Sequence, residues 1–130
     1  MKLHAAGPSA YNTITGYGED YVTVNGQRHQ ASIVVLPEKI IPWPAQGFDT
    51  LSAENFVFLK NLNAEIVLLG TGAKLEWPDT DLIGALAARG IGLEIMSTPA
   101  ACRTFSVLVQ EQRRVAAALF NFAAGATSAK

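Results

Sequence analysis

The segment from Gly90 to Phe122 constrains the fold more than any other part of this sequence. An apolar run over residues 91–96 predicts a β-strand, and an amphipathic pattern that follows it predicts a helix ending near Glu111. Thr98 is expected to cap this helix, with Pro99 at the first helical position. A charged turn and a second apolar run complete a strand-helix-strand unit. Such units are typical of open α/β sheets, which usually bind ligands beyond the carboxyl ends of their strands.

Further upstream, the dipeptide Asn25-Gly26 separates two runs with strand character. Asn-Gly readily adopts the positive φ angles of a tight type I′ turn, so residues 21–24 and 27–36 are expected to form a β-hairpin. Pro37 should end the second strand, because proline cannot donate a backbone hydrogen bond. The proline-rich segment 37–51 is expected to be a loop that packs on the domain.

Two more helices and one more strand complete the predicted pattern. Ser52 should cap a helix that runs to about Leu62, and a short apolar strand covers residues 64–69. Asp79 or Thr80 should then open another helix. The element order β-β-α-β-α-β-α-β predicts a mixed α/β fold, with one mixed sheet or two small sheets and right-handed crossovers between sequential strands.

Length and composition favour a single domain. A chain of 130 residues with 49% apolar content can build one hydrophobic core and is too short for two ordinary ones. We expect an irregular lead-in over residues 1–18 with room for one short strand, a globular domain over 19–123 and a disordered tail over 124–130. The last strand, over 115–122, could form a sheet edge that pairs between subunits and so produce a homo-oligomer.

Charge and cysteine content bear on partners and compartment. A net charge of -1 provides no field that would attract a polyanion, so nucleic acid is not an expected partner. The apolar stretches are far shorter than the roughly 20 residues of a membrane span, and the N-terminus lacks the pattern of a signal peptide. With a single cysteine, no internal disulfide can form, which suits a reducing compartment, and we expect a cytoplasmic protein.

A candidate ligand site involves two backbone features. The amides of Gly70-Thr71-Gly72, after one strand, and those at the helix start near Thr98, after another, could hold a phosphate or carboxylate. The glycine segment matches neither the P-loop nor the GxGxxG spacing, so a plain turn is the alternative interpretation. Arg103 could reach toward this turn and offer a bidentate donor pair to an anion.

Three side chains around this helix start have both a functional and a structural interpretation. Cys102 lies near the positive end of the helix dipole and could be a nucleophile, although free cysteines are more often buried. Glu94 falls in a strand that should be central, where a carboxylate needs a partner. An internal ion pair of Arg103 with Glu94 or with Glu65 is therefore the alternative to a functional pocket.

Other residue types give little indication of chemistry. Trp43 and Trp77 lie beside prolines and could bind a ligand or a partner, or could instead seal the core. Asp79 and Asp81 fit helix-capping roles better than a catalytic pair. Two distant histidines and one cysteine do not suggest a metal site, and no cofactor motif is present.

The sequence resembles a family of uncharacterised bacterial and archaeal domains, the Mth-type domain family. The resemblance rests on NGQRHQASIVVLP, the proline-flanked Trp43, LLGTG, GIGLEIMSTPAACRTF and RRVAAALF, and it covers residues 21–122. Its most specific part is residues 98–105; Ser106 and Gln112-Arg113 depart from the residues common in the family. The family includes the third mitochondrial respiratory complex I assembly factor and the adipogenesis-associated Mth-type domain protein. The resemblance implies a three-layer fold with mixed β structure and, by analogy, a role in complex assembly through protein contacts.

Two hypotheses for function follow. The leading one is a protein-interaction or assembly module without enzymatic activity, because no catalytic set is recognised. The alternative is binding or turnover of a small anionic ligand between the glycine turn and the Thr98 helix start. The residues proposed for the ligand or partner surface are Trp43, Gly70, Thr71, Gly72, Glu94, Thr98, Cys102, Arg103 and Thr104.

Overall fold

The computed structural model describes residues 11–18, 21–43 and 51–120. The helices of this part are α2 (Ala53–Lys60), α3 (Thr80–Ala87) and α4 (Thr98–Gln110). The strands are β1 (Ile14–Tyr17), β2 (Val22–Val24), β3 (Gln27–His29), β4 (Ile33–Val35), β5 (Ile40–Pro42), β6 (Ile66–Gly70), β7 (Gly92–Met96) and β8 (Val115–Leu119). The expected tail over 124–130 and most of the lead-in lie outside the described residues.

The strands form two sheets. The smaller one is antiparallel, in the order β1-β2-β3, and the larger one has the order β5-β4-β8-β6-β7. In the larger sheet β8, β6 and β7 are parallel, whereas β4 runs antiparallel to β8 and to β5. The predicted mixed α/β fold is therefore confirmed.

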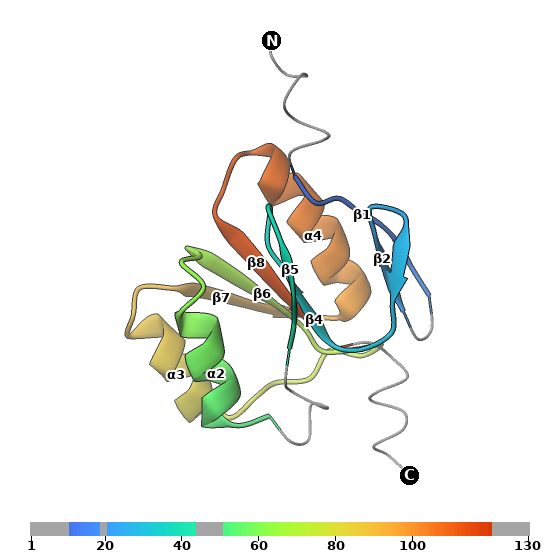
Figure 1. Ribbon diagram of the computed structural model, residues 1–130. Helices are drawn as coiled ribbons and strands as arrows, with labels where there is room; N and C mark the ends of the chain where they lie inside the picture. Colours follow the sequence, from blue (N-terminus) through green and yellow to red (C-terminus); the bar gives the residue numbers. More distant parts are fainter. Residues whose placement is uncertain (1–10, 19–20, 44–50, 121–130) are drawn as a thin grey trace.

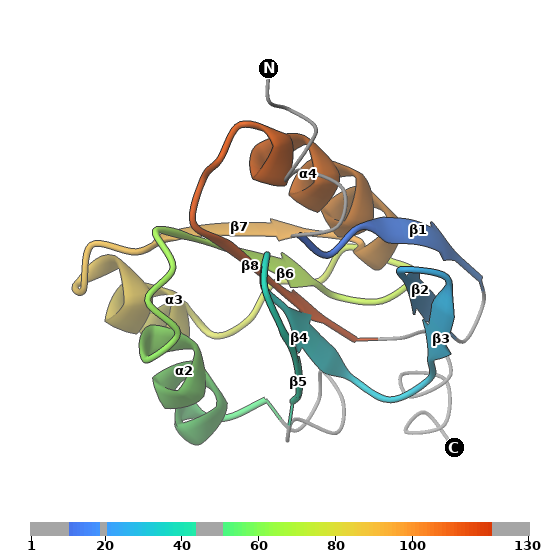
Figure 2. The same ribbon diagram turned by 45° about the horizontal axis from the view of Figure 1, so that its top comes forward.

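Helices cover both faces of the larger sheet, which gives three layers (Figure 1). Helix α4 packs on one face, with Cys102 and Phe105 against side chains such as Leu68. Helices α2 and α3 pack on the other, with Phe56 and Leu86 in the second core. Successive strand residues alternate between the two cores, as a pleated strand buried on both faces requires. The small sheet joins the α4 side, where β1 lies alongside α4 (Figure 2).

Successive strands are added to the sheet first in one direction and then in the other, and this reversal explains why helices lie on both faces. From β6 it passes through α3 to the neighbouring β7, and from β7 it returns through α4 to β8 on the far side of β6. Two crossovers of the same hand that step in opposite directions place their helices on opposite faces.

The central strand of the larger sheet is built from small residues. Strand β8 lies between β4 and β6, and its middle residues Ala116, Ala117 and Ala118 are completely buried. The expectation that this strand forms a sheet edge is therefore wrong, because the edges are β5 and β7. Residues 121–122 of the expected strand lie outside the described part.

The predicted hairpin turn is confirmed, but its second strand is divided. Asn25 and Gly26 have φ angles of 54° and 83°, and Val24 pairs with Gln27. The chain then leaves the small sheet after His29 and enters the larger sheet at Ile33. The reason is burial: Ile33–Val35 is buried throughout and needs a central position, whereas β3 is largely exposed.

Tertiary pairing corrects one further expectation and bears out another, the short strand allowed for in the lead-in. Residues 40–42, expected in a loop, form β5 beside β4. Pro42 is tolerated there because an edge strand leaves one row of backbone donors unused. Residues 14–17 of the lead-in form β1, which pairs with β2.

The helix starts follow the sequence closely, with one shift. The predicted cap at Ser52 is confirmed. Of the two candidates Asp79 and Thr80, Asp79 caps α3, and its Oδ1 accepts a hydrogen bond from the amide of Asp81 at 2.9 Å. Helix α4, however, is capped by Ser97 rather than Thr98, and Ser97 Oγ accepts from the amide of Ala100. Thr98 is thus freed for the tertiary contacts described below.

Candidate functional site

The Gly70-Thr71-Gly72 turn has no free amide for a ligand. The amide of Thr71 donates to the carbonyl of Met96 at 2.9 Å, and that of Gly72 donates to Thr98 Oγ1 at 2.9 Å. All three residues of the turn are buried. The predicted anion cradle is therefore wrong, because hydrogen bonds within the protein occupy these donors.

Thr98 closes the predicted crevice. Its hydroxyl donates to the carbonyl of Phe120 at 2.6 Å, and its amide donates to the carbonyl of Gly72 at 2.8 Å. The side chain is almost completely buried, and a Cβ atom added to Gly70 would lie 3.0 Å from Thr98 Oγ1. The ends of β6 and β8 and the start of α4 are thus packed together, and the geometry does not support the anionic-ligand hypothesis at this place.

Cys102 is a buried structural residue and not an exposed nucleophile. Its side chain is 2% exposed and belongs to the core between α4 and the sheet. Burial raises the pKa of the Cys102 thiol to about 12, although the nearby charge of Arg103 acts in the opposite direction. The thiol is therefore protonated at neutral pH and inaccessible.

Arg103 lies on the outer side of α4. Its Nη1 donates to the hydroxyl of Tyr17 in β1 at 3.0 Å. The predicted ion pair with Glu94 or Glu65 is not formed. The guanidinium points toward β1 and solvent, and Glu65 binds Arg113 instead.

Glu94 does not occupy a central strand. Strand β7 is the outermost strand of the larger sheet, and the Glu94 side chain is exposed. It forms no ion pair within the described part of the chain. The sequence showed an apolar strand but contained no signal for its place in the sheet, and so the predicted need for a buried partner was wrong.

The two tryptophans differ in exposure. Trp43 is 4% exposed and stacks on Phe120, with ring centroids 4.8 Å apart, so it seals the core beneath α2 and α3. It cannot belong to an exposed partner surface, contrary to the surface predicted around it. Trp77 is 66% exposed on the loop between β6 and α3, together with Leu75.

Three of the predicted surface residues are accessible. Arg103 is exposed and Thr104 half-buried on the outer side of α4, and Glu94 is exposed at the edge of the sheet. Near Arg103, Tyr17 is 40% exposed and Val107, one helical turn along, is 54% exposed. We call Tyr17, Arg103, Thr104 and Val107 the α4 surface. An arginine, a tyrosine and an aliphatic side chain in one patch are typical of protein-protein interfaces.

A hollow at the opposite end of the parallel strands was not predicted. It has a volume of about 580 Å³, with Leu36, Leu62 and Val109 among its apolar lining. Its charged lining consists of Lys39, Arg113, Arg114 and the acidic Glu38, so cations outnumber carboxylates there. The charged turn before β8 was the available signal, but it was interpreted only as a turn.

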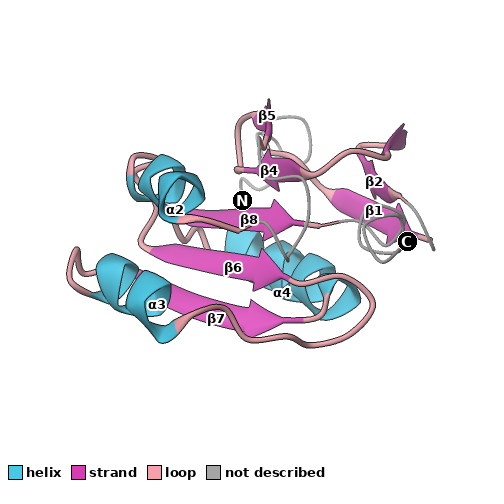
Figure 3. Cartoon of the chain, turned by 90° about the horizontal axis from the view of Figure 1, so that it is seen from below, coloured by secondary structure: helices cyan, strands magenta, loops and turns pink. Residues whose placement is uncertain are grey.

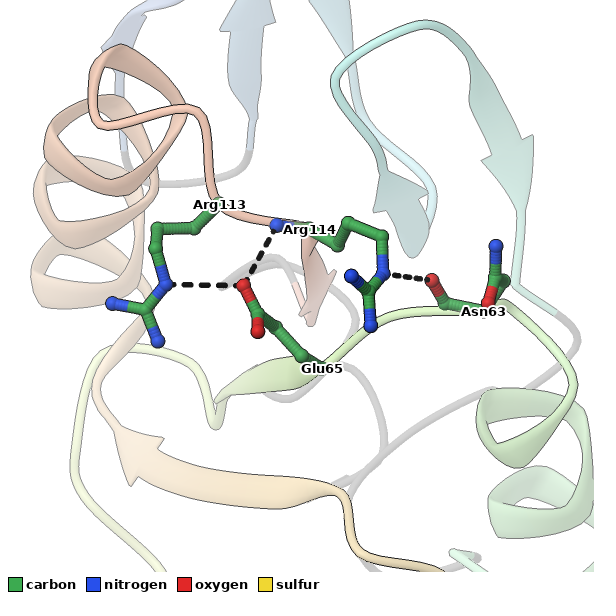
Figure 4. A network of polar contacts seen from close by, with 4 residues as sticks. All are labelled: Asn63, Glu65, Arg113 and Arg114. Atoms are coloured by element: carbon green, nitrogen blue, oxygen red, sulfur yellow. Dashed lines mark hydrogen bonds and ion pairs between the residues drawn. The ribbon is translucent and has the colours of Figure 1, made fainter.

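Glu65 organises the arginines of this hollow (Figure 4). Its Oε2 accepts from Arg113 Nε at 3.0 Å and from the Arg114 amide at 3.2 Å, while Arg114 Nε donates to the Asn63 carbonyl. The hydrogen bond from Arg113 is the main cause that lowers the pKa of Glu65. The network joins the starts of β6 and β8.

The described residues contain no group of three histidine, cysteine or acidic side chains arranged to hold a metal ion. Among the helices of the same part, none has the length and apolar character needed to cross a membrane.

Comparison with known proteins identifies the family. A family model described as "Protein of unknown function (DUF498/DUF598)" matches residues 14–120. The chain belongs to this family. Solved structures support the architecture. A crystal structure of a Bordetella parapertussis protein is 36% identical to this chain, with a TM-score of 0.81; the match covers 85% of this chain and 96% of the other. A Bordetella pertussis protein described as a Mth938-like domain is 31% identical, with a TM-score of 0.79. The match covers 94% of this chain and 93% of that protein. The predicted membership of the Mth-type domain family is confirmed.

The family connects the chain to an assembly factor. This chain is 34% identical over 119 residues to NADH dehydrogenase (ubiquinone) 1 alpha subcomplex assembly factor 3 of Danio rerio. The match covers 90% of this chain and 68% of that protein. The rat protein of the same name is 35% identical; the match covers 82% of this chain and 58% of the rat protein. The chain is thus an assembly-factor-like domain.

Proposed function

We propose that this domain is a non-enzymatic protein-interaction module that assists the assembly of a respiratory membrane complex, acting from the cytoplasm. The observation that carries the proposal is the similarity to complex I assembly factors over most of the chain. The single cysteine, buried and protonated, is compatible with a reducing compartment.

The α4 surface is the proposed contact for the protein partner. Arg103 carries a positive charge at the surface, and its hydrogen bond to Tyr17 orders both long side chains. Ordering before binding reduces the entropy that a complex would otherwise lose. The inner residues of α4 are fixed in the core, so changes on its outer side should leave the fold intact.

The test is affinity capture from a lysate of the native cell, with identification of the retained proteins. Arg103→Glu should abolish capture of a specific partner that the unmodified domain retains. Arg89→Glu is the matched control, because it makes the same charge change at an exposed residue beyond the end of α3. Thermal unfolding of all three proteins confirms that they are folded.

Loss of the partner in Arg103→Glu but not in Arg89→Glu supports both the module and its surface. Equal capture by the two variants rejects the α4 surface. If the unmodified domain retains no respiratory-complex subunit or assembly protein, the assembly role itself is rejected.

A further inference from the structure

Strand β7 leaves backbone groups on its outer edge without a hydrogen-bond partner among the described residues. Among the described strands it pairs with β6 alone, and the bonds from the Gly92 amide to Glu65 and from the Thr71 amide to Met96 fix which residues face that partner. In a parallel ladder, alternate residues direct both their N–H and C=O groups to one neighbour. Leu93 and Ile95 therefore direct theirs outward, where no described group binds them.

The other edge of the larger sheet is less suitable for strand pairing. Strand β5 has three residues and ends in Pro42, and prolines and short lengths protect sheet edges. Strand β7 has five residues, contains no proline and carries one charged side chain, Glu94. It is the longer and less protected edge.

The two sides of the β7 edge differ in chemistry. Leu93 and Ile95 pack toward the core beneath α2 and α3, and Glu94 points to the opposite side of the sheet, where it is exposed and has no ion-pair partner among the described residues. On its way to α3, the loop after β6 passes the outer edge of β7 (Figure 3). This loop carries the exposed Leu75 and Trp77, which are 51% and 66% exposed.

We propose that the β7 edge binds an extended segment of a partner protein, which adds a sixth strand to the sheet. Leu93 and Ile95 supply its backbone hydrogen bonds. Because side chains alternate along a strand, the segment carries a cationic residue opposite Glu94 and apolar residues on the side of Leu93 and Ile95. This site is separate from the α4 surface and does not depend on it.

Charge argues against a second copy of the chain as the occupant. An antiparallel copy centred on Glu94 would place two carboxylates directly opposite each other, and like charges in that position destabilise a strand pair. A cationic residue at the same place forms a favourable cross-strand pair with Glu94.

The test uses the complete chain, labelled with ¹⁵N, and a synthetic peptide in which valine and lysine alternate. A matched peptide has glutamate in place of each lysine. At a peptide concentration that leaves roughly a tenth of the protein unbound, the lysine peptide should slow hydrogen exchange of the Leu93 and Ile95 amides roughly tenfold. The Trp77 indole resonance should shift, while the Gly92 and Glu94 amides, already bonded to β6, should change little.

Charge reversal completes the experiment. Glu94→Lys should transfer the protection from the lysine peptide to the glutamate peptide, and the control Glu54→Lys, on α2, should leave the preference unchanged. Equal protection by both peptides, or by neither, overturns the proposal. Protection that appears with protein concentration alone identifies a second copy as the occupant and also overturns it.

Discussion

Thr98 and Phe120 are joined by a buried hydrogen bond of 2.6 Å, in which the threonine hydroxyl donates to the phenylalanine carbonyl. The same hydroxyl oxygen accepts from the Gly72 amide. One side chain thereby connects the first turn of α4 to the ends of two neighbouring strands, in a region that the sequence suggested was open to ligands.

Replacing this hydroxyl tests its structural importance. Thr98→Val preserves the shape but removes the hydrogen bonds that this hydroxyl forms with the Phe120 carbonyl and the Gly72 amide, so the free energy of unfolding should fall by about 1–3 kcal/mol. Urea denaturation measures the change. Thr104→Val, at a half-buried position on the same helix, should change stability much less. Equal effects of the two substitutions would contradict the role of the Thr98 hydroxyl.

Gly70 and Gly84 form a matched pair. An added Cβ at Gly70 would lie 2.9 Å from a Leu119 methyl and 3.1 Å from the Thr98 Cα, so Gly70→Ala should destabilise the fold by about 1–3 kcal/mol. At Gly84, in α3, nothing lies within 4 Å, and Gly84→Ala should stabilise it by roughly 0.5–1 kcal/mol through helix propensity. Chemical denaturation compares the two, and opposite signs are expected.

Cys102 should make stability depend on alkaline pH. Its folded pKa, about 12, exceeds the ordinary value of 9.0, so its contribution is complete below pH 9 and is lost as pH rises toward 12. Over that window the loss approaches about 1.4 kcal/mol per pH unit. The difference in unfolding free energy between the natural chain and Cys102→Ala isolates this contribution. A difference that stays constant from pH 8 to 11 would show that the thiol ionises normally.

Glu65 should titrate below its ordinary value because Arg113 binds its charged form. The lowered pKa stabilises the fold above the unfolded value of 4.5, and this stabilisation is lost as pH falls through the folded pKa. In Arg113→Gln the pKa of Glu65 should rise, as followed by carboxyl carbon NMR. Arg89→Gln, at a distant exposed position, is the control and should leave the titration unchanged.

Local signals predicted local structure well. Asn25-Gly26, Ser52 and Asp79 each act through backbone geometry or hydrogen bonds within a few residues, and each was placed correctly. The position of a strand within a sheet depends instead on contacts between distant segments. For that reason residues 27–36 were expected to form one strand, and Glu94 was placed at the centre of the sheet rather than at its edge.

The candidate site was harder to predict for a related reason. Small polar residues at a strand end, such as Thr71 and Thr98, are equally suited to binding a ligand and to bonding backbone groups of neighbouring segments. Only the three-dimensional structure shows that their donors are already used. The exposure of Arg103 was predictable from the helical pattern, but its partner Tyr17, 86 residues earlier in the chain, was not.

The alanines at the middle of β8 set the thickness of the whole domain. Ala117 belongs to the core beneath α4, and Ala116 and Ala118 belong to the core beneath α2 and α3. A larger side chain at any of them would push a helix layer outward, because the strand has neighbours on both edges and packed residues on both faces. The smallest side chains of the core are thus the positions that tolerate substitution least, and the absence of bulky side chains on β8 sets the distance between the helix layers.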